Sequence, residues 1–405
     1  MNIRNTLVRA RDKGSETPCP ICGSKKLRVF FEMLYVPVHI GLLWSSRDAA
    51  RNCPRGDIKL AFCPVCSHIT NVAFDPGRLE YTQAYENPLD FSPRFQAYAR
   101  SLAERLIERY KLHNKDIISI GCGKGNFLLL MCELGNNRGV GFDPAYVEHE
   151  EHIAVKDRVK FIQDFYSERY ANYQGDLIDC RHVLEHIHNP KGFLNMLRNA
   201  IGNRLGTHVF FEVPNALNTF RRFFVWDIIY EHCSCFTPIS LSLAFSSSGF
   251  SVCELTEEFE GQFLGIHAQP NSDSAQYSNY EQMDEVNRIA NDTASFAAHY
   301  QRKVETFRHK LEQIERRGQR TVVWGTGSKG VTFLNTFKNS QVEYAVDINP
   351  RKQGMYVVGT GQQIVLPEFL RDYQPDVIIV MNPIYKTEIQ QLTKKLGVAT
   401  KFMYA

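Results

Sequence analysis

Short apolar runs alternate with segments of helical periodicity between residues 115 and 268. Apolar runs of four or five residues, bounded by turn residues, are typical of buried strands. The runs are Ile117–Ile120, Gly139–Phe142, Leu177–Asp179 and Val209–Val213, and helical patterns cover Phe127–Leu134 and Pro190–Ile201. Because strands that alternate with helices form parallel sheets, this part of the chain is predicted to be an α/β unit.

A second, smaller alternation follows near the C-terminus. It contains apolar runs at Thr321–Trp324, Val342–Val346 and Val377–Met381 and a helical pattern at Lys329–Phe337. Between the two units, Tyr280–Arg317 is polar and has few helix breakers, so it predicts one or two exposed helices. A further amphipathic helix is expected at Pro93–Leu112, where apolar residues recur at helical spacing.

Composition argues against several classes of partner. The 405 residues are 43% hydrophobic and 22% charged, and the net charge is +3 with no long Lys/Arg run, so nothing indicates nucleic acid or a membrane surface. No N-terminal stretch has the apolar length of a signal peptide, and none elsewhere reaches the roughly 18 apolar residues that span a bilayer. We therefore expect a cytoplasmic protein with a small-molecule partner, of undefined oligomeric state.

Four of the eleven cysteines form two Cys-x-x-Cys pairs near the N-terminus. Disulfides are a poor explanation in a chain expected in the cytoplasm. Each pair, Cys19 with Cys22 and Cys63 with Cys66, lies on a turn rich in Pro or Gly, and two such turns direct four thiolates to one tetrahedral Zn²⁺. Four thiolates leave no position for water, so the predicted zinc is structural. Redox pairs or buried free thiols are the alternatives.

The expected elements divide the chain into five segments. They are a zinc-binding domain (1–75), a linker helix (76–114), a Rossmann-like α/β domain (115–268), a helical linker (269–318) and a smaller C-terminal Rossmann-like α/β domain (319–405). A chain of this length is expected to hold more than one domain.

A glycine-rich turn, GCGKGNF at 121–127, follows the first strand of the larger α/β domain. Gly121, Gly123 and Gly125 let the backbone approach a ligand, and the next helix offers free N–H groups. Asp143 ends the next strand about twenty residues later, where a carboxylate binds ribose hydroxyls, and Asp164 is a candidate partner for an adenine amine. The turn lacks the Gly-x-Gly-x-x-Gly spacing of nicotinamide sites. It resembles motif I of class I S-adenosylmethionine (SAM) methyltransferases.

Two polar segments after later strands are candidates for catalysis. The first is RHVLEHIHNP at 181–190, in which we expect His186 to face the reaction and His182 to contact the cofactor. The second is DIIYEHCSCF at 227–236, with Tyr230, Glu231 and His232 in sequence. A histidine oriented by a carboxylate is a serviceable general base. A capping or packing role for these polar residues is the alternative. A metal site at the histidines of the first segment is a further alternative, but it is hard to reconcile with the Leu and Glu between them.

The smaller α/β domain opens with GTGSKG at 325–330, and Asp347 ends its next strand. This pattern matches a dinucleotide fingerprint, so bound NAD is one interpretation. The other is a turn that serves packing or binds a phosphate of the substrate. On the second interpretation Lys329 contacts the substrate, and we expect Asn215, after the fourth strand, to contact it as well.

The order of these parts resembles the nucleotide-sugar C-methyltransferase family, whose characterised members make branched deoxysugars. The resemblance covers nearly the whole chain. Its most telling motifs are the paired Cys-x-x-Cys and the Lys-Gln-Gly at 352–354, because neither belongs to methyltransferases in general. It implies a class I SAM methyltransferase domain between a zinc-binding domain and a Rossmann-like domain, which together clasp a nucleotide-sugar.

In that family a base removes the proton beside a 4-keto group of a nucleotide-linked deoxysugar, and the enolate attacks the SAM methyl carbon. By resemblance, His232 is the base, and Tyr230, Glu231 and His186 line the sugar. The family's Tyr-His-Glu-His run is one residue shorter here. This departure lies outside the residues of the expected SAM site and inside the segment that the resemblance assigns to the sugar.

A second departure concerns the segment at 81–90, which corresponds to a Tyr- and Ser-rich segment of the family but lacks the serines. Tyr81, Tyr85 and Glu86 are the substrate contacts that remain expected there. Three other functions stay open: an O- or N-methyltransferase acting on a sugar or another small metabolite, a non-catalytic protein that binds SAM or a nucleotide, and a redox enzyme.

Overall fold

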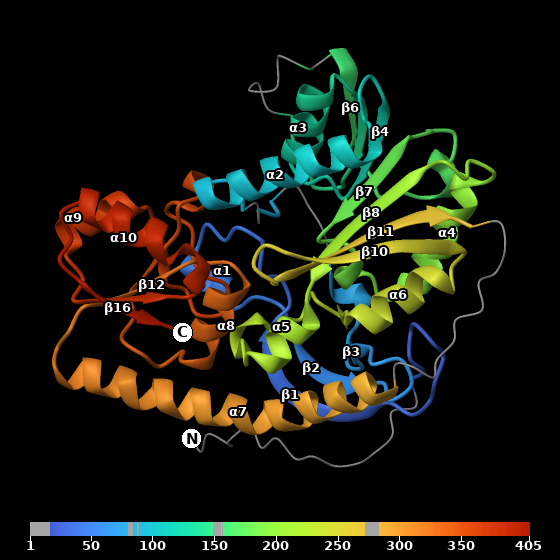
Figure 1. Ribbon diagram of the computed structural model, residues 1–405. Helices are drawn as coiled ribbons and strands as arrows, with labels where there is room; N and C mark the ends of the chain where they lie inside the picture. Colours follow the sequence, from blue (N-terminus) through green and yellow to red (C-terminus); the bar gives the residue numbers. More distant parts are fainter. Residues whose placement is uncertain (1–16, 80–83, 87–88, 149–154, 156, 272–282) are drawn as a thin grey trace.

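Three β-sheets and the helices around them make up the described part of this computed structural model (Figure 1). The structure describes residues 17–79, 84–86, 89–148, 155, 157–271 and 283–405. None of the helices in these residues combines the length and the apolar character needed to cross a lipid bilayer. The predicted α/β class is confirmed.

The central sheet has seven strands in the order β10-β11-β8-β7-β4-β5-β6. The strands are β4 (Asp116–Ile120), β5 (Arg138–Phe142), β6 (Val159–Ile162), β7 (Leu177–Arg181), β8 (His208–Pro214), β10 (Phe250–Glu258) and β11 (Phe263–Pro270). The strands from β8 to β6 are parallel, whereas β11 is antiparallel to β8 and β10. The four strands expected from the apolar runs correspond to β4, β5, β7 and β8.

Helices cover both faces of the central sheet. One face carries α2 (Pro93–Tyr110) and α3 (Asn126–Gly135), and the other carries α4 (Pro190–Ile201) and α6 (Pro238–Ser246). Successive residues of a strand point to opposite faces. Accordingly, Ile117 of β4 belongs to the core under α2 and α3, whereas Ile118 belongs to the core under α4 and α6. Both faces are buried, which explains the continuous apolar runs.

The first sheet is antiparallel and draws on two distant parts of the chain. Its order is β1 (Arg28–Pro37), β2 (Arg55–Phe62), β3 (Ile69–Asn71) and β9 (Ser234–Cys235). The pairing of β9 with β3 aligns Ser234 with Thr70. A segment inside the larger α/β domain therefore completes the sheet that the N-terminal segment begins.

The third sheet is parallel and has the order β14-β13-β12-β15-β16. Its strands are β12 (Thr321–Trp324), β13 (Tyr344–Val346), β14 (Gln363–Val365), β15 (Val377–Val380) and β16 (Lys401–Tyr404), and its helices are α8 (Ser328–Thr336), α9 (Leu370–Tyr373) and α10 (Lys386–Lys395). The remaining short helices are α1 (Arg47–Arg51) and α5 (Ala216–Arg221). The smaller α/β unit is thus present as predicted.

A single helix of 34 residues, α7 (Met283–Arg316), runs along both the first and the third sheet (Figure 1). Phe296 packs edge to face on Phe31 of β1 at 5.3 Å, and Phe307 packs on Phe333 of α8 at 5.5 Å. The expectation of an exposed helix is therefore wrong for one face. That face is buried because its aromatic residues fill the space between the two sheets.

Candidate active site

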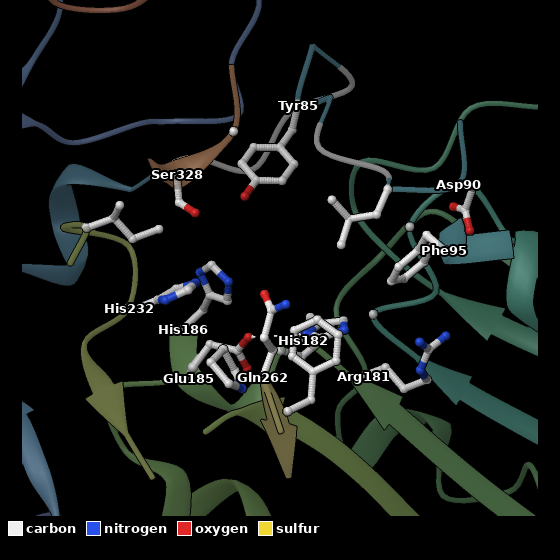
Figure 2. A pocket seen from close by; sticks show the side chains of 18 of the residues that line it. Tyr85, Asp90, Phe95, Arg181, His182, Glu185, His186, His232, Gln262 and Ser328 are labelled. Carbon is white, nitrogen blue, oxygen red and sulfur yellow. Dashed lines mark ion pairs between the residues drawn. The ribbon is translucent and has the colours of Figure 1, made fainter. Parts of the chain in front are cut away.

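A cavity of about 700 Å³ lies where the three sheets meet (Figure 2). Its walls are the carboxyl ends of β4, β5, β7 and β8, the turn between β12 and α8, and the loop before β9. Ligands of open parallel sheets bind at the carboxyl ends of the strands, and small-molecule sites measure roughly 300–1,000 Å³. The volume therefore suits a cofactor and a small substrate.

The glycine-rich turn after β4 is held tightly against the end of β5. The N–H groups of Gly121 and Cys122 both donate to the carbonyl of Phe142, at 2.8 and 3.2 Å. Gly121 has a φ of 67°, and a Cβ there would lie 2.1 Å from Cγ2 of Val183. Only glycine meets both conditions, so the turn depends on this residue. Gly125, with a φ of 88°, then caps α3.

Asp143, at the end of β5, is oriented by two backbone N–H groups. Gly123 donates to its Oδ2 at 2.8 Å, and Ala145 donates to its Oδ1 at 2.7 Å. Burial raises the pKa of this carboxyl, and the two hydrogen bonds oppose that shift. Each oxygen still has a lone pair for a ribose hydroxyl. The turn and the acid therefore come together as a SAM site requires, and these residues fit the cofactor.

The two other predicted cofactor contacts, Asp164 and His182, also line the cavity. The carboxylate of Asp164 accepts a hydrogen bond from the Tyr170 hydroxyl at 2.5 Å and pairs with the guanidinium of Arg169. His182 follows β7 in a left-handed conformation, with a φ of 56°. Both side chains are thus held in place by neighbouring groups.

Glu212 of β8 forms a buried anion beneath the cavity. It pairs with Arg181 at 2.9 Å and with Nε2 of His182 at 2.9 Å, and the hydroxyl of Tyr98 donates to it. Burial alone would raise the pKa of Glu212, but the Arg181 guanidinium and the other partners lower it to about 2. The carboxylate therefore stays ionised and fixes both Arg181 and His182, which line the cavity.

Two imidazoles and a carboxylate converge on one wall of the cavity (Figure 2). The rings of His186 and His232 lie 4.9 Å apart between centroids, at 87°. Burial lowers the pKa of His186 to about 4 and that of His232 well below its ordinary value, so both are neutral. Burial also raises the pKa of Glu185 to about 7. This wall offers neutral nitrogen bases next to an acid of unusually high pKa.

Glu231 lies one side chain behind the cavity wall. Tyr85, which lines the cavity, donates its hydroxyl to Oε2 of Glu231 at 3.2 Å, and the N–H of Ile40 donates to Oε1 at 3.0 Å. Burial raises the pKa of Glu231 to about 7. Within the described chain, Glu231 is not among the residues that line the cavity, and its carboxylate instead orients Tyr85.

Three other predicted site residues have structural contacts outside the described cavity lining. Tyr230 packs on Gly56, and its hydroxyl accepts from the N–H of Asp75 at 2.8 Å. The side chain of Asn215 caps α5. Glu86 accepts from the amide of Asn349 at 3.0 Å and pairs with Arg351 at 3.3 Å, which links the segment after the first sheet to the third sheet. Tyr81 lies outside the described residues.

The GTGSKG turn of the third sheet borders the same cavity. Lys329 pairs with Asp227 at 2.5 Å, and both residues line the cavity. A Cβ at Gly330 would lie 1.8 Å from the carbonyl oxygen of Gly325, so α8 approaches the end of β12 closely. The N-terminus of α8 therefore faces the cavity with its N–H groups and a cation nearby.

Asp347 differs from Asp143 in how its carboxylate is used. It accepts from the N–H of Asn349 at 3.0 Å and from the N–H of Thr326 at 3.1 Å, and the Thr326 hydroxyl also donates to it. Lys352 pairs with it at 3.2 Å. These partners occupy the carboxylate that would grip the ribose of NAD, so the geometry argues against bound NAD and favours the other interpretation, a turn that serves packing or binds a phosphate of the substrate.

The four N-terminal cysteines form one compact cluster. The Sγ atoms of Cys19 and Cys66 are 3.6 Å apart, and those of Cys22 and Cys63 are 3.5 Å apart. A tetrahedral zinc with bonds of about 2.3 Å places its sulfurs ~3.8 Å from each other. The donor set and its spacing therefore fit Zn²⁺.

The seven-stranded sheet, the turn at Gly121 and the carboxylate of Asp143 define a class I SAM-dependent methyltransferase. Residues 94–255 match a family described as a methyltransferase domain. Residues 264–405 match a second family, described as a C-methyltransferase C-terminal domain. Two successive segments of the chain are thus similar to a methyltransferase domain and to the C-terminal domain of C-methyltransferases.

The solved structures that this chain matches align with only part of it. They include a magnesium protoporphyrin IX methyltransferase from Synechocystis, at 14% identity over 44% of this chain and 84% of that one, with a TM-score of 0.34. A 1,6-didemethyltoxoflavin-N1-methyltransferase from Burkholderia thailandensis is 14% identical over 44% of this chain and 82% of that one, also with a TM-score of 0.34. A SAM-dependent methyltransferase from Aquifex aeolicus is 13% identical over 42% of this chain and 89% of that one, with a TM-score of 0.31. A comparison with curated proteins gave no match.

Sequence reasoning missed the parts of Glu185 and Asp227. Glu185 stands between the two histidines of the His-Val-Leu-Glu-His loop, and a 3-10 turn over Leu184–His186 brings its carboxylate beside His186. Asp227 opens the segment at 227–236 that contains His232, and its pairing with Lys329 joins two distant parts of the chain. The available signal in both cases was a charged residue in a segment that carries a candidate histidine.

Proposed function

We propose that this protein methylates a carbon atom beside the keto group of a 4-keto, nucleotide-linked deoxysugar. The observation that carries the proposal is the pair of neutral imidazoles, His186 and His232, in the cavity that also contains the cofactor turn. The match of residues 264–405 to a C-methyltransferase C-terminal domain supports carbon as the methylated atom.

In this proposal His232 is the general base. A carbon beside a ketone becomes nucleophilic only after its proton leaves, so a positioned base is needed. The nitrogen of a neutral imidazole accepts that proton, and the resulting positive charge lies next to the carboxylate of Glu185. His186 and Tyr85, which border the same space, are the proposed contacts of the sugar.

SAM, when bound, supplies an electrophilic methyl group. Gly121 and Gly123 would hold its amino-acid end, and Asp143 would bind its ribose hydroxyls. Asp164 and His182 are the further proposed contacts because both line the cavity. The chain's part in methyl transfer itself is alignment of the donor with the acceptor.

The nucleotide part of the substrate is proposed to bind beside α8. The N–H groups at the N-terminus of this helix suit a diphosphate, and Lys329 adds a positive charge beside them. Its partner Asp227 holds the ammonium at the cavity edge. Glu86 and Asn215 are proposed to position this region, since each tethers a segment next to the cavity.

We also propose that Cys19, Cys22, Cys63 and Cys66 hold a structural Zn²⁺. The Sγ spacing of 3.5–3.6 Å supports it, as does the absence of a position for water in a four-thiolate set. Cys19, Cys63 and Cys66 belong to the same apolar core as β4 and β8. Zinc is therefore expected to stabilise the contact between the first and the central sheets.

Proton exchange in D₂O tests the proposed function. The protein is incubated with a 4-keto nucleotide-sugar and S-adenosylhomocysteine, and loss of the proton beside the keto group is followed by NMR. We expect exchange with the wild-type protein and with the control His188→Ala, whose exposed side chain lies in the same loop as His186. The His232→Ala variant should lose exchange at least a hundredfold.

The outcomes separate the possible failures. Exchange that survives His232→Ala removes His232 as the base. Methylated product without any exchange in the wild-type protein would contradict carbon methylation and favour transfer to oxygen or nitrogen. Retained binding of S-adenosylhomocysteine in calorimetry shows that the variant is folded.

A further inference from the structure

Glu185, His186 and His232 bring three metal-binding atoms together outside the cysteine cluster. One ligand atom from each residue lies within 4.8 Å of those of the other two. The residues come from two segments, the 3-10 turn after β7 and the loop before β9, and their side chains point toward one another in Figure 2. A thiol hydrogen bond from Cys233 to the carbonyl of Glu185, at 3.5 Å, ties the two segments together.

The carboxylate of Glu185 has an unmet need for a partner. The residue is only 1% exposed, and within the described chain its Oε2 atom has no hydrogen-bond partner. The Oε1 atom lies 3.9 Å from Nδ1 of His182, which is beyond hydrogen-bond distance, and the carboxylate accepts a hydrogen bond from the backbone N–H of Glu185 itself. An unsatisfied buried carboxylate oxygen costs free energy unless a cation or a proton satisfies it.

His186 is oriented as metal-binding histidines are. One of its ring nitrogens hydrogen-bonds to the backbone of Glu231. A carbonyl that accepts from one ring N–H fixes the tautomer and leaves the lone pair on the other nitrogen, which is the usual arrangement around a metal. The ring planes of His232 and His186 are 87° apart, so the rings are not stacked. A nitrogen of each ring can therefore approach the same ion.

The three ligand atoms lie within 4.8 Å of one another and must move closer to hold an ion. Zinc bonds to imidazole and carboxylate measure about 2.0–2.2 Å, so ligand atoms at tetrahedral angles around one ion are ~3.4 Å apart. Three protein ligands leave further coordination positions on the ion, and all three of these residues line the cavity. Two imidazoles and a carboxylate favour zinc, cobalt or nickel over magnesium or calcium.

We propose that Glu185, His186 and His232 form a second site for Zn²⁺ or a similar divalent transition-metal ion, and that an ion bound there inhibits the enzyme. The nitrogen of His232 that binds the ion has no lone pair left to accept a proton. Metal binding stands on the geometry alone, whereas inhibition rests on the proposed function. The ion is a reversible occupant and takes no part in methyl transfer.

Metal titration tests the binding half without any sugar substrate. Protein whose cysteine cluster already holds one equivalent of zinc is titrated with ZnCl₂ in a calorimeter. We expect one further equivalent to bind at micromolar concentration. The near-isosteric Glu185→Gln and the His186→Asn variants should bind it at least tenfold more weakly, whereas His188→Ala should bind as the wild type does. Absence of a second equivalent, or equal binding by Glu185→Gln, would overturn the site.

The exchange reaction tests the inhibitory half. Added ZnCl₂ should abolish proton exchange with a midpoint equal to the dissociation constant from calorimetry, and chelation of the second equivalent should restore it. Faster exchange in the presence of the ion would overturn inhibition. If the second equivalent binds but no exchange occurs under any condition, the metal site stands and the proposed function fails.

Discussion

Lys352 and Asp347 form a buried ion pair at 3.2 Å beside the glycine-rich turn of the third sheet. Removing one member of a buried pair leaves the other charge uncompensated, at a cost of roughly 3–5 kcal/mol. We therefore expect Lys352→Met to lower the midpoint temperature of thermal unfolding by several degrees, as measured by calorimetry. The control is Lys111→Met, because the pair of Lys111 with Glu108 is exposed and screened by solvent. Equal effects of the two changes would contradict the buried role.

Removal of Asp179 should change how stability depends on pH. Its carboxyl is fully buried and accepts from the Ser119 hydroxyl at 2.9 Å, and burial raises its pKa from 3.8 to about 7. The folded state therefore holds a proton that the unfolded state has released between about pH 4 and pH 7. Stability from this group is complete below pH 4 and is lost as the pH rises through 7.

We accordingly expect Asp179→Asn to stabilise the protein at pH 8, by up to about 4 kcal/mol at 1.4 kcal/mol per pKa unit, and to leave it nearly unchanged at pH 4. Urea denaturation at both pH values measures the difference. Asp157→Asn, at an exposed position, is the control. A variant less stable than wild type at pH 8 would show that the carboxylate of Asp179 is needed ionised.

The sequence predicted the regular elements well where local signals end them. Helix α4 has the expected bounds because Asn189 caps its first turn and Gly202 follows its last residue. Burial of α7 was missed, because most residues of this helix are polar and its one aromatic face is covered only by the two neighbouring sheets. Local pattern specifies the helix, but not what packs against it.

The cofactor side of the candidate site was also readable from sequence, since a turn and an acid at fixed spacing lie on adjacent strands. The catalytic side was not. Tyr230, Glu231 and His232 are consecutive, yet only His232 reaches the cavity. Which of three neighbours faces inward depends on the course of a loop, and here β9 sets that course by pairing with β3.

Asp143 should control cofactor affinity. A hydrogen bond to a charged group contributes about 1.5–3 kcal/mol, so Asp143→Asn is expected to weaken binding of SAM roughly 10- to 100-fold. Calorimetric titration with SAM measures this, with Asp157→Asn as the matched change at an exposed position. Unchanged affinity would move the ribose away from the end of β5.

Loss of one cysteine ligand should remove one equivalent of zinc and destabilise the contact between two sheets. We expect Cys63→Ser to lower the free energy of unfolding by about 3 kcal/mol or more, because its sulfur belongs to the core shared with the central sheet. Cys253→Ser, at an exposed cysteine, should keep both metal and stability. Full zinc content in the Cys63 variant would contradict the four-thiolate site.

The two residues of β9 directly follow Cys233 and His232. They pair with β3 at the edge of a sheet that begins about two hundred positions earlier in the chain. A fragment trimmed to residues 115–268 would keep the crevice for the methyl donor while losing the anchor that aims its proposed base. Such a fragment would bind the methyl donor but would transfer its methyl group poorly. In this fold, binding of the methyl donor and positioning of the proposed base depend on different segments of the polypeptide. Mutations can therefore impair one of them without the other.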